Sequence, residues 1–134
     1  MRKVLAIIVM LSVILTGCGE KPISATDKII EHYKTLSRTN NTATIRGEIS
    51  ELESLSNDTS LTLNEQMFAK YTYNIACGVV KLDLSGKGVS FFDFPEIEML
   101  VNVIGAVAEG EFEIDQEMLE ESKKFLKKVE DFLK

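Results

Sequence analysis

Apolar residues recur at intervals of three and four along most of this chain after residue 26, which is the spacing of one face of an α-helix. The recurrence falls into five stretches, and short polar or glycine-containing segments separate them. The five stripes consist of Ile29, Ile30, Tyr33 and Leu36; Ile45, Ile49, Leu52 and Leu55; Met67, Phe68, Tyr71, Ile75, Val79 and Leu82; Ile97, Leu100, Val101, Ile104, Val107 and Ala108; and Met118, Ser122, Phe125, Val129 and Phe132. The pattern predicts an all-α fold, a compact bundle of about five amphipathic helices.

The third stripe has recognisable signals at both ends. Thr62 and Glu65 have the spacing of a capping box, in which each residue satisfies the free backbone amide of the other. Gly86 and Gly88 follow the stripe and suit a helix end and a turn. We expect this long stretch to form the central helix. The first helix is expected from Asp27 to about Arg38.

The stretch 96–108 is apolar nearly all round, except for Glu98 and Asn102, so we expect it to be the most buried helix. Asp93 and Pro95 precede it and predict a helix start with an acidic cap and proline in the first turn.

Acidic residues alternate with others from Glu109 to Glu117. We expect a solvated acidic linker here, with Asp115 capping the last helix. Two alternatives stay open: a short strand pairing with 89–92, and a calcium site, although the run lacks the early aspartates and the sixth-position glycine of an EF-hand loop.

The N-terminus has the build of an export signal. Arg2 and Lys3 are followed by twelve residues, Val4 to Leu15, that are all apolar except Ser12. This length matches the core of a signal peptide and falls short of the roughly 20 residues that a transmembrane helix needs. Thr16, Gly17 and Cys18 then close the segment.

The order Leu15-Thr16-Gly17-Cys18 resembles the lipobox of bacterial lipoproteins, with Leu at −3 and Cys at +1. The resemblance implies a thioether-linked diacylglycerol on Cys18 and cleavage between Gly17 and Cys18. The alternative is an ordinary secretory peptide with a chance cysteine. We therefore expect a cleaved signal peptide at 1–17, a lipidated cysteine and tether at 18–26, and a single helical domain at 27–134.

A lipoprotein of this kind is expected in the cell envelope, on the outer face of the cell membrane or, in a Gram-negative cell, on the outer membrane. Two or more acyl chains suffice for stable anchoring. Removal of 1–17 takes away Arg2 and Lys3, so 13 basic residues face 21 acidic residues and the net charge becomes −8. This charge argues against a nucleic-acid partner, because phosphate binding needs clustered Lys and Arg.

Few residues suggest chemistry. Cys77 lies in an apolar stretch and is expected to be a buried free thiol, with an intermolecular disulfide as the alternative. His32 is the only histidine, and we expect a solvated side chain; the alternative is a metal site with Asp27 and Glu31. We expect no cofactor, no metal and no catalytic residue.

The segment 89–94 concentrates three aromatic residues beside a glycine turn. Phe91, Phe92 and Phe94 are the best candidates for an exposed contact with a partner, because aromatic residues often dominate binding energy. The alternative is that they plug one end of the bundle.

These features favour a non-enzymatic, membrane-anchored interaction module for an envelope protein, of the adaptor, pilot, exclusion or inhibitor type. The alternative is a lipoprotein that binds a lipid or a small apolar ligand in a pocket lined by the helix at 96–108.

Overall fold

The computed structural model describes residues 24–86, 93–111 and 113–134, and this part of the chain is all-helical, as predicted. Its five helices are α2 (Ala25–Arg38), α3 (Thr42–Ser56), α4 (Leu63–Leu84), α5 (Glu96–Ala108) and α6 (Gln116–Phe132). The described parts of 109–117 outside α6 are turn and irregular chain rather than strand, whereas 89–92 lies outside the described residues.

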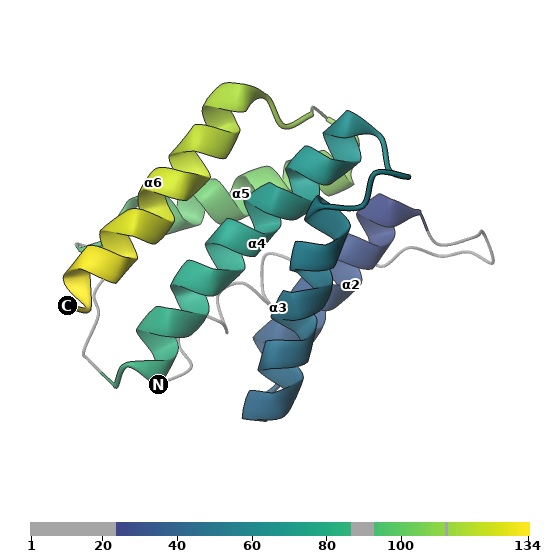
Figure 1. The fold of residues 1–134 in the computed structure, drawn as a ribbon. Helices are drawn as coiled ribbons and strands as arrows, with labels where there is room; N and C mark the ends of the chain where they lie inside the picture. The colour runs from purple at the N-terminus through teal and green to yellow at the C-terminus, as the bar shows by residue number, and fades with distance from the viewer. Residues whose placement is uncertain (1–23, 87–92, 112) are drawn as a thin grey trace.

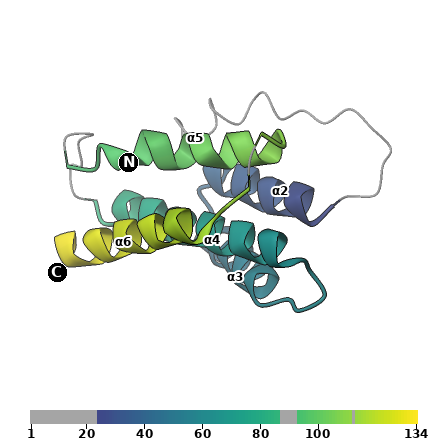
Figure 2. The same cartoon turned by 90° about the horizontal axis from the view of Figure 1, so that it is seen from above.

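The helices form two layers (Figures 1 and 2). Helices α3, α4 and α6 lie side by side in one layer, and α2 and α5 lie in the other. Helix α4 is in contact with each of the other four described helices, and α2 also contacts α3 and α5. The prediction that α4 is the central helix is therefore confirmed.

Side-chain caps fix where several helices begin. The hydroxyl of Thr62 accepts a hydrogen bond from the Glu65 amide at 3.2 Å, and the Glu65 carboxylate accepts one from the Thr62 amide at 2.9 Å, so the predicted capping box is confirmed. Helix α2 begins at Ala25, two residues before the predicted start, because Ser24 caps it by accepting from the Asp27 amide.

The N-terminus of α6 also has its predicted cap, since the Asp115 carboxylate accepts a hydrogen bond from the Met118 amide at 2.8 Å. The predicted acidic cap of α5 was wrong. Its N-cap position is Pro95, whose side chain has no acceptor, and no side-chain hydrogen bond caps the helix there.

Glycines in the left-handed region end α4 and α5. Gly86 has φ +72° after α4, as predicted, and Gly110 has φ +78° after α5. Beyond Gly110, the Glu111 amide donates to the Ala106 carbonyl at 3.0 Å, which completes a Schellman motif. The motif satisfies carbonyls that the helix end would leave open.

The most buried helix is α4, so the expectation that 96–108 would hold this position was wrong. Every residue of α4 from 74 to 80 is buried, which covers the whole circumference of the helix. Helix α5 buries only one side, made of Ile97, Leu100, Val101 and Ile104. A helix surrounded by others buries all its faces, whereas a helix in an outer position buries one.

Helices α4 and α6 pack closely at a glycine. A Cβ atom placed on Gly78 would lie 2.4 Å from an edge carbon of the Phe125 ring. The ring cannot easily move aside, because Phe125 is buried and makes an edge-to-face contact with Phe94 at a centroid distance of 6.0 Å. The absence of a side chain at Gly78 therefore sets the spacing of these two helices.

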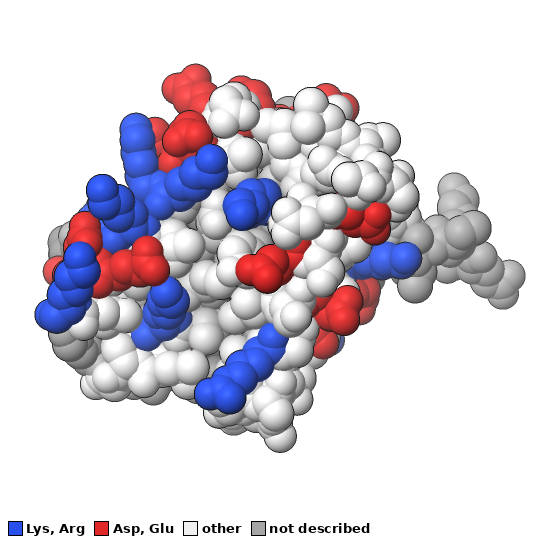
Figure 3. All heavy atoms as spheres, in the orientation of Figure 1, with Lys and Arg blue, Asp and Glu red and all other residues white. Residues whose placement is uncertain are grey.

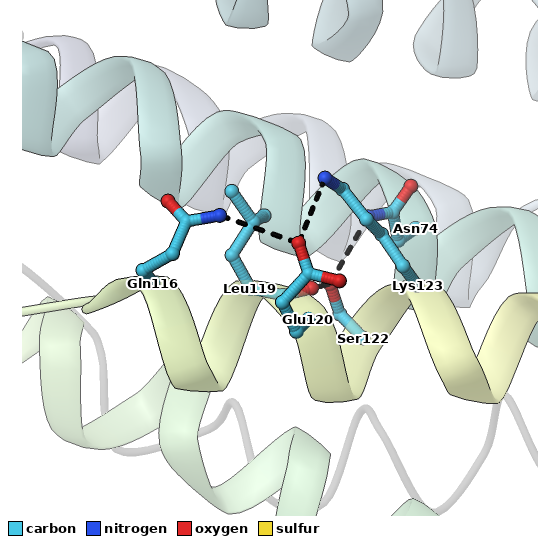
Figure 4. Close-up of polar contacts among 6 residues, drawn as sticks. All are labelled: Asn74, Gln116, Leu119, Glu120, Ser122 and Lys123. Carbon is cyan, nitrogen blue, oxygen red and sulfur yellow. Dashed lines mark hydrogen bonds and ion pairs between the residues drawn. The ribbon is translucent and has the colours of Figure 1, made fainter.

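One buried hydrogen bond also joins α4 to α6 (Figure 4). The Asn74 side-chain amide donates to the Ser122 hydroxyl at 3.0 Å, and that hydroxyl donates to the Leu119 carbonyl at 2.6 Å. Both side chains are buried, so the pair fixes the register of the two helices. The neighbouring Glu120 contacts are at the surface of α6.

We expect Gly78→Ala to destabilise the fold by about 1–2 kcal/mol, because overpacking against Phe125 outweighs the gain in helix propensity. Gly47→Ala is the matched control. Gly47 also lies inside a helix, but a Cβ there would meet nothing within 4 Å. That change should stabilise by about 0.5–1 kcal/mol. Urea unfolding of both variants measures the two effects, and the same sign for both would contradict the packing argument.

Ser122→Ala should cost about 1–3 kcal/mol, because it leaves the buried Asn74 amide without its acceptor. Ser56→Ala serves as the control. The Ser56 hydroxyl also donates to a carbonyl three residues earlier at 2.6 Å, but at the protein surface. Its loss should change the free energy of unfolding by less than about 0.5 kcal/mol. Equal effects of the two changes in thermal unfolding would argue against a role for the Asn74 contact.

Candidate interaction surface

The side of α5 that faces away from the bundle forms an open depression of about 450 Å³. We call this surface the α5 outer face, and define it by the six residues that line the depression: Pro95, Glu98, Met99, Asn102, Val103 and Ala106. Met99 is 57 % exposed and is one of the few large apolar side chains left open to solvent among the described residues. Pro95, Val103 and Ala106 are the other apolar residues of the lining.

The opposite side of α5 is fully used in holding the helix to the bundle. Its apolar side chains pack into the core, and the Tyr71 hydroxyl of α4 donates to the Leu100 carbonyl at 2.8 Å. Burial raises the pKa of the Tyr71 hydroxyl well above its usual range, so the hydroxyl remains a donor even in alkaline solution. The Lys128 ammonium of α6 pairs with Glu96 at 3.1 Å. These contacts fix which side of α5 faces outward.

The residues of α5 and those that flank it in the sequence carry acidic groups and no basic ones. No lysine or arginine occurs from residue 88 to residue 122 of the sequence. Glu98 lines the depression, and Glu109 and Glu111 are exposed just beyond the end of α5. The opposite face of the molecule differs, because there the lysines of α6 mix with acidic residues (Figure 3).

Of the three phenylalanines predicted to contact a partner, Phe91 and Phe92 lie outside the described residues. For Phe94 the alternative, packing at one end of the bundle, is confirmed, because its side chain is only 1 % exposed. Its ring makes an edge-to-face contact with Phe132 at a centroid distance of 5.3 Å, and the Lys128 ammonium lies 5.0 Å from its centroid. Phe94 therefore fills one end of the bundle.

His32 is not the freely solvated side chain that the sequence suggested. Its Nδ1 makes a close polar contact with the Glu48 carboxylate of α3, and both side chains are about three-quarters buried. The contact therefore joins α2 to α3. Among the residues that the structure describes, no group of three or more His, Cys, Asp or Glu side chains is placed to hold a metal ion.

Cys77 is buried and free, as predicted. Burial raises the pKa of its thiol, although the neighbouring Tyr73 hydroxyl opposes this shift. The Tyr73 hydroxyl itself donates to the Glu53 carboxylate at 3.0 Å. A protonated, buried thiol is a poor nucleophile, so Cys77 acts as a packing residue.

The predicted lipidation site, Gly17 and Cys18, lies outside the described residues, and lipid attachment stays a prediction. Within 24–86, 93–111 and 113–134, none of the helices combines the length and the apolar character needed to cross a bilayer.

Sequence reasoning missed the α5 outer face, because a helix that is apolar nearly all round was expected to be buried. A signal was present: Glu98 and Asn102 are four residues apart and so share one side of the helix. They mark the side that faces water.

Comparisons with protein-family models, with curated proteins and with solved structures found no match.

Proposed function

We propose that this protein is a membrane-anchored lipoprotein that acts as a non-enzymatic interaction module, with the α5 outer face as the surface that binds an envelope protein. The observation that carries the proposal is the exposed apolar depression on α5, whose opposite side is committed to the core. Lipid on Cys18 would hold this surface at the membrane and raise its local concentration near a partner in the same membrane.

The tether limits where the partner is found. Only residues 19–24 separate Cys18 from the first helix, and an extended chain of that length spans at most about 20–22 Å. The folded domain would therefore remain close to the bilayer. A partner within this reach is itself in or on the membrane.

The alternative function, binding of a lipid or small apolar ligand, is less well supported. Ligand pockets usually enclose most of the ligand surface. The depression on α5 lies on the outside of the bundle and is open to solvent, so it would leave an apolar ligand in contact with water. An open surface suits a protein partner better.

The test is site-specific photocrosslinking in the cells that make the protein, with the photoreactive residue at position 99. The matched control carries it at position 84, because Leu84 is also 57 % exposed but lies at the end of α4. We expect one dominant envelope protein crosslinked from position 99 and not from position 84. The same adduct should fall sharply with Cys18→Ala, which removes the anchor.

Equal crosslinking from both positions, or no adduct from position 99, would contradict the proposed interaction surface. Lipid that co-purifies with the protein and is lost with Met99→Lys would favour the ligand-binding alternative. If Cys18→Ala left both the adduct and the membrane attachment unchanged, the proposal that lipid on Cys18 anchors the protein would be wrong.

A further inference from the structure

We propose that the partner of the α5 outer face is a basic amphipathic helix, with an apolar stripe that covers the depression and Lys or Arg residues that flank the stripe. This inference rests on the proposed function and specifies the chemistry of the partner. Three properties of the surface carry it: its shape, its residue types and its charge.

The α5 outer face runs along the length of α5. Its lining positions recur at intervals of three and four, so they form a strip along α5. From Pro95 to Ala106 the strip is about 16 Å long, or three turns of a partner helix. A partner helix of that length can lay its apolar side along the strip.

The residue types allow a close approach. Met99 is flexible and adapts to the shape of an apolar surface, and Ala106 is small enough to admit a neighbouring side chain. Gly105 adds to this, since a Cβ there would meet nothing within 4 Å. Met99 therefore offers an adaptable apolar contact, and the small residues Gly105 and Ala106 leave room for a partner side chain near the C-terminal end of α5.

The charge selects a basic partner. Glu98 lies within the depression, and Glu109 and Glu111 stand beyond the C-terminal end of α5, where the helix dipole is also negative. Glu96 is already paired with Lys128, so Glu98 is the acid best placed to meet a cation from outside. Complementary charge speeds association and excludes acidic partners.

The same charges argue against the bilayer surface as the occupant. Anionic lipids attract Lys and Arg, and α5 with its flanking residues contains neither. The exposed carboxylates of Glu98, Glu109 and Glu111 would instead repel an anionic bilayer. A helix with Lys or Arg beside its apolar stripe meets both requirements of this surface.

The experiment uses the full-length protein in nanodiscs of zwitterionic lipid, with empty nanodiscs as the background. The probes are two fluorescein-labelled peptides of about 18 residues, five helical turns, with the same amphipathic pattern of leucine and either lysine or glutamate. We expect saturable binding of the Lys/Leu peptide, and at least about tenfold weaker binding of the Glu/Leu peptide.

Substitutions on the surface should abolish this preference. Met99→Lys and Asn102→Lys each place a positive charge in the depression, and we expect each to weaken binding of the Lys/Leu peptide at least about tenfold. Leu84→Lys is the matched control and should change the affinity by less than about twofold. Glu98→Gln should weaken binding and reduce its dependence on salt. Circular dichroism confirms that each variant is folded.

Equal binding of the two peptides, or equal effects of Met99→Lys and Leu84→Lys, would overturn the proposal. A protein that crosslinks to position 99 but is not displaced by the Lys/Leu peptide would also overturn it, while leaving the proposed function intact. If the Lys/Leu peptide did not bind and the residue at position 99 contacted the nanodisc lipid, the bilayer would be the occupant of this surface, and the proposal would be wrong.

Discussion

The burial of α4 on its whole circumference is the constraint on which the rest of the structure depends. The other four described helices surround it, and each must place an apolar stripe against it. Gly78 allows α6 to come close enough for the Phe125 ring to cover the helix backbone. The buried Asn74–Ser122 hydrogen bond then fixes the register of α4 and α6.

A domain of this size keeps much of its chain at the surface, and α4 is the one described helix that is buried on its whole circumference. The chain nevertheless has a second helix, α5, that is apolar nearly all round. One side of α5 packs on the bundle and ties to it through Tyr71, and the other side is left at the surface. The exposed face of α5 is thus a consequence of α4 already occupying the centre.

Much of the fold follows from local sequence signals. The capping box at Thr62 and Glu65 and the left-handed glycine at Gly86 act within a few residues, so they were predictable. The candidate site was less predictable. Phe94 and its aromatic neighbours suggested an exposed cluster, but burial of Phe94 depends on a ring contact with Phe132, far away in the chain. Likewise, the contact of His32 with Glu48 depends on how α2 lies on α3.

For the described residues, the sequence by itself determined the helical class, the five helices, most of their ends and the free, buried state of Cys77, because these depend on hydrophobic periodicity and on contacts between near neighbours. Only the tertiary structure decided which helix became the centre and which side of α5 faced outward. Helices α4 and α5 both have enough apolar surface for the central position. Packing between segments distant in sequence decides which of the two helices is central. Gly78 lets α6 approach α4, whereas the Tyr71 hydrogen bond holds α5 to the bundle by one side.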